Sequence, residues 1–198
     1  MTEHYFTANP QSRSHPRLFK LTIRGRELDL TTDAGVFAAT GLDRGTRLLI
    51  EALVVPPEAR CLVDLGCGYG PIGLALALLA PTARVFLVDP NERACMLAKA
   101  NAAKNLIANV TVVQGEGLSA IPGEIDLVAT NPPIRAGKKV VYGLMAEAAQ
   151  RLKAGGALWT VIRTSQGAKS LEAELGRVFR EVMEVEKGGG FRVYRAVR

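Results

Sequence analysis

The chain has 198 residues, 48% of them apolar and 22% charged, which is the composition of a globular protein with one sizeable core. Its three cysteines, Cys61, Cys67 and Cys95, are odd in number and lack paired spacing; this argues against a disulfide framework or a metal site and favours a reducing cytoplasm. The 25 basic residues outnumber the 19 acidic ones, and a net charge of +6 suits a polyanionic partner, although an ordinary solvated surface gives the same excess.

The N-terminal segment indicates a basic arm without a targeting signal. Met1 to Pro10 lacks the apolar run of a secretion signal. The most apolar stretch of the chain, Ile72 to Ala80, has nine residues. That is about half of a membrane span, so we expect a buried helix and no membrane association. Among the first 26 residues, five cations face only Glu3: Arg13, Arg17, Lys20, Arg24 and Arg26.

The first part of the chain predicts a β-hairpin and one helix. Leu18 to Ile23 and Glu27 to Thr32 alternate apolar with polar residues around Arg24-Gly25-Arg26. A turn signal at Thr32–Gly35 follows, then a helix from about Gly45 to Leu53 that Pro56-Pro57 ends. We therefore expect one domain, with the hairpin and helix in residues 1–55 and an α/β core in residues 56–198.

From residue 60 onward, apolar strands alternate with helical patterns. Strands are predicted at 60–65, 84–88, 110–113, 125–129 and 157–162, and helices at 72–80, 92–104, 138–152 and 169–179. Two last strands are joined at Gly188-Gly189-Gly190, which predicts an antiparallel pair at one edge. This alternation predicts a parallel sheet covered on both faces, and such sheets bind ligands at the carboxyl ends of their strands.

A glycine-rich loop follows the first strand of the core. Gly66, Gly68 and Gly70 allow a tight turn and a close approach of the backbone to a ligand. A pyrophosphate-binding turn needs glycine where Pro71 stands, and Asp64 would place negative charge near the phosphates. Both features argue against a nicotinamide oxidoreductase. They favour a ligand with a cationic ammonium head, held by Asp64 directly or through water.

The next two strands also end in polar residues. Asp89 lies 25 residues after Asp64, where a carboxylate can accept both hydroxyls of a ribose or can cap the following helix. With the glycine loop nearby, we favour the ribose. In Gln114-Gly115-Glu116-Gly117, either polar side chain can reach an adenine amino group, and glycine-flanked polar residues also form plain turns. The role of Glu116 therefore stays open.

The fourth core strand ends in Asn131-Pro132-Pro133-Ile134. The two prolines remove two backbone donors and leave carbonyl oxygens beside the Asn131 side-chain oxygen. Acceptors that hold both hydrogens of an exocyclic amine weaken the delocalisation of its lone pair, which can then attack an electrophilic methyl group. Such a displacement requires positioning more than a strong base. This corner therefore predicts methyl transfer to an amino nitrogen.

Together these blocks resemble a known family. The Asp64 glycine loop, Asp89 and Asn131-Pro132-Pro133 resemble class I methyltransferases that act on amino nitrogen. Thr32-Asp33-Ala34-Gly35-Val36-Phe37 with Asp43-x-Gly45-Thr46 resembles, more narrowly, the small-domain methyltransferases related to ribosomal RNA guanine-N2 enzymes. The stretches 134–138 and 166–171 resemble a compact single-domain branch of that family.

The resemblance implies a Rossmann-like fold, with a seven-stranded, mostly parallel sheet, helices on both faces, an antiparallel last strand and the hairpin in front. It implies S-adenosylmethionine as the cofactor and guanine N2 of ribosomal RNA as the target. Its cofactor contacts would be Asp64, Gly66, Cys67, Gly68, Asp89, Glu116 and Asn131, with Phe37 and Thr46 closing over the cofactor. Asn131, Pro132 and Pro133 would hold the target amine.

Two departures from the family pattern bear on the substrate. Ile134 stands where many such enzymes carry an aromatic residue that stacks on the base, so Phe37 or Tyr142 would have to stack instead, although each is also a common core residue. Larger relatives have an extra N-terminal domain for RNA. Here the RNA would be held by the hairpin arm and by Arg135, Lys138 and Lys139, or by a second subunit; monomer and homodimer both stay open.

Two other functions remain as alternatives. A protein glutamine methyltransferase would hold a side-chain amide with the same acceptors, but those enzymes prefer an aromatic residue after the prolines and have a helical substrate domain. A non-catalytic RNA-binding module has no need of the Asn131-Pro132-Pro133 corner.

Overall fold

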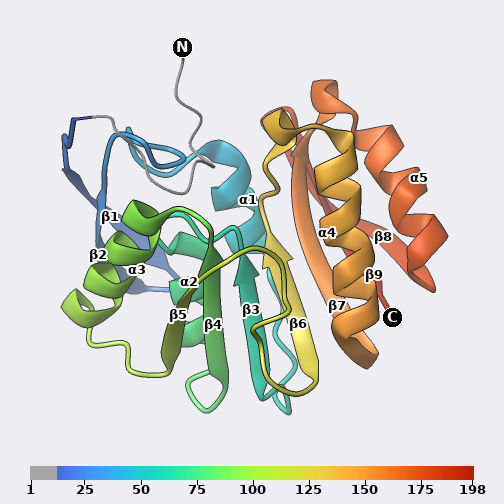
Figure 1. The fold of residues 1–198 in the computed structure, drawn as a ribbon, viewed down its shortest axis with the longest axis horizontal. Coiled ribbons are helices and arrows are strands. Elements are labelled where there is room, and N and C mark those ends of the chain that lie inside the picture. The colour runs from blue at the N-terminus through green and yellow to red at the C-terminus, as the bar shows by residue number, and fades with distance from the viewer. Residues whose placement is uncertain (1–12) are drawn as a thin grey trace.

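A seven-stranded sheet forms the centre of the computed structural model, which describes residues 13–198 (Figure 1). Its strand order is β5-β4-β3-β6-β7-β9-β8. The five strands β3 to β7 are parallel, and β9 runs antiparallel between β7 and β8. The predicted fold class is therefore confirmed. The bounds are β3 Cys61–Leu65, β4 Arg84–Asp89, β5 Val110–Gln114, β6 Ile125–Thr130, β7 Leu152–Arg163, β8 Glu181–Gly188 and β9 Phe191–Val197.

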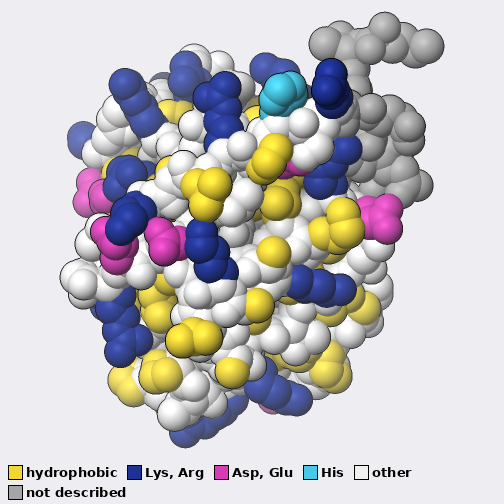
Figure 2. Space-filling view, turned by 90° about the vertical axis from the view of Figure 1, so that its left-hand side faces the viewer, with side chains coloured by type: hydrophobic (Ala, Val, Ile, Leu, Met, Phe, Trp, Pro, Cys, Tyr) yellow, Lys and Arg dark blue, Asp and Glu magenta, His cyan; other side chains and the backbone are white. Residues whose placement is uncertain are grey.

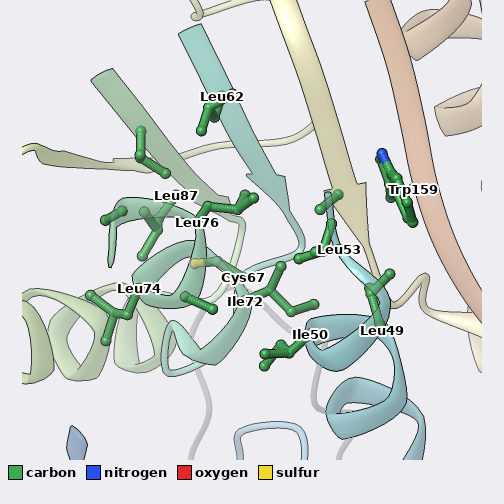
Figure 3. Close-up of a cluster of buried hydrophobic side chains, with 14 of the residues drawn as sticks. Leu49, Ile50, Leu53, Leu62, Cys67, Ile72, Leu74, Leu76, Leu87 and Trp159 are labelled. Atoms are coloured by element: carbon green, nitrogen blue, oxygen red, sulfur yellow. The ribbon is translucent and has the colours of Figure 1, made fainter. Parts of the chain in front are cut away.

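Helices cover both faces of this sheet because its strands are apolar on both sides. Leu62 of β3 joins one hydrophobic cluster and its neighbour Val63 joins the other. Helices α1 Arg44–Ala52, α2 Pro71–Leu79 and α3 Glu92–Lys104 pack into the first cluster, which includes Leu49, Ile72 and, from β7, Trp159 (Figure 3). Helices α4 Lys138–Arg151 and α5 Ala168–Val178 pack into the second. No helix in residues 13–198 is both long and apolar enough to cross a bilayer.

One boundary differs from the prediction. The sequence predicts a helix up to residue 152 and the next strand only from residue 157, but β7 already begins at Leu152, which pairs with Ile125. The register shifts between Ile125 and Leu127. A Cβ on Gly156 would lie 3.0–3.2 Å from three carbonyl oxygens. Gly155 and Gly156 therefore lie inside the strand, where they accommodate an irregularity in the pairing. The sequence pattern does not distinguish this irregularity from a turn.

The predicted hairpin consists of β1 Arg17–Ile23 and β2 Arg26–Thr32. Arg24 and Gly25 both have positive φ, 46° and 80°, as a two-residue type I′ turn requires. Asn101 of α3 and Asn105, the residue that follows this helix, each donate to and accept from the β2 backbone, at Thr31 and Asp29, over 2.8–2.9 Å. The apolar side of the hairpin belongs to the same hydrophobic cluster as α1 to α3. The residues Met1 to Pro10, with Glu3 and His4, lie outside the described residues.

Asp126 of β6 anchors the beginning of β3. Its carboxylate accepts the backbone N–H groups of Arg60 and Cys61 over 2.9 and 2.8 Å and pairs with Lys153. Burial would raise the pKa of Asp126, but the Lys153 ammonium and the two N–H groups outweigh it and hold the pKa below 3.8. A depressed carboxyl pKa stabilises the fold above the unfolded pKa, and the stabilisation is lost as the pH falls through the folded pKa.

We therefore expect Asp126→Asn to lower the free energy of unfolding at pH 7 by roughly 1–3 kcal/mol. Urea unfolding at several pH values measures this, and the difference from the wild type should shrink below about pH 4. The control is Glu27→Gln, which removes the exposed Lys20–Glu27 pair and should change stability by less than about 1 kcal/mol. A difference that is independent of pH would contradict the role of the Asp126 charge.

Candidate functional site

A cavity of about 580 Å³ opens at the carboxyl ends of β3, β4 and β6, the edge that the topology predicts. Most of its lining comes from four loops that follow strands and from residues 36–46, which lead from the hairpin into the first turn of α1. From the core these are the loop at 65–69, Asp89, the loop at 115–117, and Asn131 with Pro133; from the N-terminal part they are Val36, Phe37, Ala38, Asp43 and Thr46. The glycine loop and the Asn131 corner therefore share one cavity, which is of a size usual for small-molecule sites.

The glycine loop turns back onto the end of β4. The N–H groups of Gly66 and Cys67 both donate to the Val88 carbonyl, over 2.8 and 3.0 Å. Gly66 has a φ of +75°, and a Cβ there would meet nothing within 4 Å, so this glycine faces open space in the cavity wall. Burial raises the pKa of the Cys67 thiol well above 9.0. Cys67 therefore contributes a neutral thiol and backbone to the wall, and no thiolate.

Asp64 lies behind this loop and does not line the cavity. Its Oδ2 accepts the N–H of Gly73 over 2.7 Å, which caps α2 at a helix start where Gly70 has no side chain to do so. Its Oδ1 is buried without a partner among the described residues. Burial raises the pKa of Asp64 to about 8, against the Gly73 hydrogen bond and with a further contribution from the Asp89 charge. Of the two expected ways of holding a cation, directly or through water, the direct one finds Leu65 and Gly66 forming the cavity wall in front of Asp64.

Asp89 lines the cavity with 8% of its surface exposed. Its Oδ2 accepts Gly68 N–H over 2.8 Å and its Oδ1 accepts Asn91 N–H over 2.9 Å. Asn91 caps α3 through Ala94 N–H, so the alternative that Asp89 is the helix cap is wrong. Burial raises the pKa of Asp89, and the two N–H groups oppose this rise.

The loop after β5 carries Glu116 into the cavity lining. Helix α4 holds this loop with two side chains one turn apart. Glu147 accepts Leu118 N–H over 2.7 Å, and Arg151 donates to the carbonyls of Leu118 and Ile121 over 2.6 Å. The sequence analysis missed this support, because nothing in the α4 sequence indicates that its polar side chains bind a loop about 30 residues earlier.

The carbonyl groups that follow Asn131 take part in hydrogen bonds within their own turn. Pro132 O accepts Ile134 N–H over 2.8 Å and Pro133 O accepts Ala136 N–H over 2.9 Å, in a tight turn followed by the 3-10 helix η1 Ile134–Ala136. The expectation that both proline carbonyls are free is therefore wrong. The Asn131 amide nitrogen donates to Thr46 Oγ1 over 3.0 Å and, over 3.5 Å, to Asp43 Oδ2. Within residues 13–198 no donor reaches the Asn131 Oδ1 atom.

With this geometry established, comparison with known proteins assigns the family. Residues 27–195 match the model of the methyltransferase small domain. The chain belongs to this family. It is 39% identical to the uncharacterised Bacillus subtilis protein YbxB, over 99% of this chain and 98% of that one.

Longer relatives in the family are named for ribosomal RNA. The large-subunit methyltransferase G and the small-subunit methyltransferase C of Ectopseudomonas mendocina are 37% and 34% identical, with 85% and 96% of this chain and 46% and 57% of theirs covered. The T. thermophilus 16S rRNA N2 methyltransferase RsmC, solved with AdoMet and guanosine, has a TM-score of 0.82 at 26% identity, covering 96% of this chain and 52% of its own. The chain spans about half the length of these named relatives.

In this methyltransferase small domain, the remaining predicted residues fall in three places. Phe37 and Arg135 line the main cavity. Ile134, Lys138 and Tyr142 line a separate small pocket, and the exposed Lys139 lines neither. Tyr142 is therefore on the wrong side to replace the missing aromatic residue, which leaves Phe37. Pro132 is buried and absent from the lining. Among the lining residues that the sequence analysis did not assign to the site are Asp43, Tyr69, Val140 and Leu144.

Proposed function

We propose that this chain is an S-adenosylmethionine-dependent methyltransferase that acts on an exocyclic amine of RNA, and specifically on guanine N2 of ribosomal RNA. One observation carries the proposal: the Asn131 amide oxygen, without a donor among the described residues, belongs to the same cavity as the glycine loop and Asp89. An acceptor for an amine and a cradle for a cofactor are the two parts that methyl transfer to nitrogen needs.

The cavity residues fit S-adenosylmethionine. Gly66 provides a wall without a side chain, where a Cβ would project into open space. Each Asp89 oxygen holds one backbone N–H and keeps lone pairs for a ribose hydroxyl. Glu116 offers an acceptor to an adenine amino group, and the carboxyl groups of Asp89 and Glu116 in the lining favour a cationic ligand over a phosphorylated one. Bound there, the cofactor supplies an electrophilic methyl group.

The protein's part in the reaction is to hold the target nitrogen. Asn131 Oδ1 accepts one amine N–H, and the carbonyl of Pro133, which lines the cavity and keeps one lone pair beyond its turn hydrogen bond, is a candidate for the other. The amine held in this way directs its lone pair at the methyl group. Phe37, which lines the same cavity, stacks on the base. The methylated nitrogen is cationic and strongly acidic, so its proton can pass to water after transfer and no strong base is required.

Cations beside the cavity suit the RNA backbone. Arg135 lines the cavity and Lys138 and Lys139 form the first turn of α4; none of the three has an ion pair with another described residue. The face that carries the hairpin shows more Lys and Arg than Asp and Glu side chains (Figure 2). On the hairpin itself Arg17, Arg24 and Arg26 are exposed. Counterion release from these contacts would favour a polyanion.

The test is transfer of label from S-adenosylmethionine to undermodified ribosomal RNA, followed by nucleoside analysis. Label in N2-methylguanosine is expected. Label in a glutamine of a ribosomal protein would replace this function by the alternative, and no transfer to either would refute the proposal.

Binding of the same RNA should weaken steeply as salt rises. The triple variant Arg135→Ala, Lys138→Ala, Lys139→Ala should reduce the slope of log K against log salt by about 2, at about 0.7 per single-strand phosphate contact. The control variant replaces three cations at the opposite end of the sheet, Arg84, Arg177 and Arg180, with alanine. Its slope of log K against log salt for the same RNA should equal that of the wild type. A flat salt response of the wild type would contradict an RNA substrate.

A further inference from the structure

The Asn131 side chain has two chemically opposite ends, and only one of them suits an amine. The amide oxygen accepts hydrogen bonds, whereas the amide NH2 group donates them. The two groups are similar in size, so a half-turn about the Cβ–Cγ bond exchanges them at little steric cost. Whatever fixes this rotation therefore decides which kind of substrate atom the corner can hold.

Two residues of the α1 start lie against the nitrogen end. Thr46 Oγ1 is 3.0 Å from Asn131 Nδ2, and Asp43 Oδ2 is 3.5 Å from it. A hydroxyl can accept from the NH2 group or donate to the oxygen, so Thr46 alone does not choose between the two orientations. An ionised carboxylate only accepts. Although the Asp43 contact is long, its negative charge attracts the NH2 end and repels the amide oxygen.

The Asp43 carboxylate is itself held in place. Its Oδ1 caps α1 by accepting the N–H groups of Gly45 and Thr46 over 2.9 and 3.1 Å, which directs Oδ2 to Asn131. Gly45 is required here because a Cβ would lie 2.8 Å from the ring of Phe191 at the start of β9. The helix cap, the packing of β9 and the amide of Asn131 are thus parts of one arrangement.

We propose that Asp43 and Thr46 are positioning residues that hold the Asn131 amide with its oxygen toward the substrate, so that the corner selects a substrate atom that carries N–H. This inference rests on the proposed function. It adds a basis for specificity: a carbonyl oxygen or an unprotonated ring nitrogen in the same place would face the amide oxygen, acceptor against acceptor, and be repelled.

The first test compares Thr46→Val with Thr46→Ser. Valine has the shape of threonine without the hydroxyl, so kcat for RNA should fall by about 10–100-fold, as for one lost hydrogen bond at the reacting group. Serine keeps the oxygen and should restore kcat to within a few-fold of the wild type. Because Thr46 also lines the cofactor cavity, the Kd for S-adenosylmethionine is measured by calorimetry in both variants, and kcat is measured at saturating cofactor. A loss of cofactor affinity with an unchanged kcat would overturn the positioning role. Wild-type kcat in Thr46→Val would overturn the proposal.

Asp43→Asn tests the charge without removing the helix cap, because asparagine caps a helix as well as aspartate does. With its oxygen on the α1 N–H groups, the new amide would direct NH2 at the Asn131 NH2. We expect a comparable fall in kcat with an unchanged urea midpoint. A variant with wild-type kcat would show that the charge does not set the orientation, contrary to the proposal.

A spectroscopic measurement separates this proposal from the proposed function. The side-chain amide signals of Asn131, identified by their loss in Asn131→Asp, should be protected from hydrogen exchange in the wild type and in Thr46→Ser, and unprotected in Thr46→Val. Equal, rapid exchange in all three proteins would overturn the positioning role. If the wild type methylates no RNA, the proposed function fails, and these signals still decide whether Thr46 and Asp43 hold the amide.

Discussion

Asn131→Ala is expected to lower kcat by about 100–1000-fold, the range found when a single preorganised polar group is removed from a reacting centre. The substitution removes the amide oxygen, and the neighbouring carbonyls of Pro132 and Pro133 each already accept one backbone N–H of the following turn. Glycine-loop and Asp89 contacts to S-adenosylmethionine remain, so its Kd should change little. Single-turnover transfer of labelled methyl to RNA, with calorimetry of cofactor binding, measures both quantities.

A double-mutant cycle is the control for this effect. If Thr46 acts through the Asn131 amide, Asn131→Ala combined with Thr46→Val should be no slower than Asn131→Ala alone, because there is no amide left to orient. Additive losses would mean that Thr46 acts by another route. Turnover at the wild-type rate in Asn131→Ala would remove the basis for amine recognition at this corner.

The elements of the fold could be predicted because their signals are local. The alternation in 18–32 and the glycine at 25 specify a hairpin whatever surrounds it, and α3 was predicted with its observed bounds because its sequence has helical spacing. The start of β7 was not predicted correctly because Gly155 and Gly156 fit a turn as well as an irregular strand. Only the pairing of Leu152 with Ile125 decides between the two.

The cavity was predictable from topology, but its contacts were not. Parallel strands bring their carboxyl ends to one edge, which places the 66–68 loop, Asp89 and Asn131 together without knowledge of the strand order. The residues that orient Asn131 lie 88 and 85 positions earlier in the chain, and no local pattern indicates such a contact. The sequence analysis noted Asp43 as part of a family motif. Its contact with the Asn131 amide can be recognised only once the structure shows that its other oxygen caps α1.

The expectations for the proline corner and for Asp64 share one physical assumption. A side chain or carbonyl adjacent to a ligand site was assumed to be available, whereas buried polar groups are almost always paired within the protein. The Pro132 carbonyl is used by the next turn, and one Asp64 oxygen is used to cap α2. Sequence motifs therefore located these residues correctly and overstated how much of each is left for a ligand.

Asp89→Ala is expected to weaken binding of S-adenosylmethionine by about 1–3 kcal/mol, or roughly 5- to 150-fold in Kd. The change removes the acceptor for the ribose and also frees Gly68 N–H, so the loop loses part of its support. Because general destabilisation could mimic this loss, the control is Asp126→Asn, which weakens the fold at the other end of the sheet and should keep the wild-type Kd.

The pH dependence provides an independent check on Asp89. Burial raises its pKa in the free protein, and ribose hydroxyls donate to the ionised form, so ligand binding should lower that pKa. Binding then releases protons, and the affinity for S-adenosylmethionine should increase as the pH rises through the raised pKa. Asp89→Ala should lose this part of the pH dependence. An affinity that is lower at higher pH, or a dependence that survives the substitution, would show that the ribose is held elsewhere.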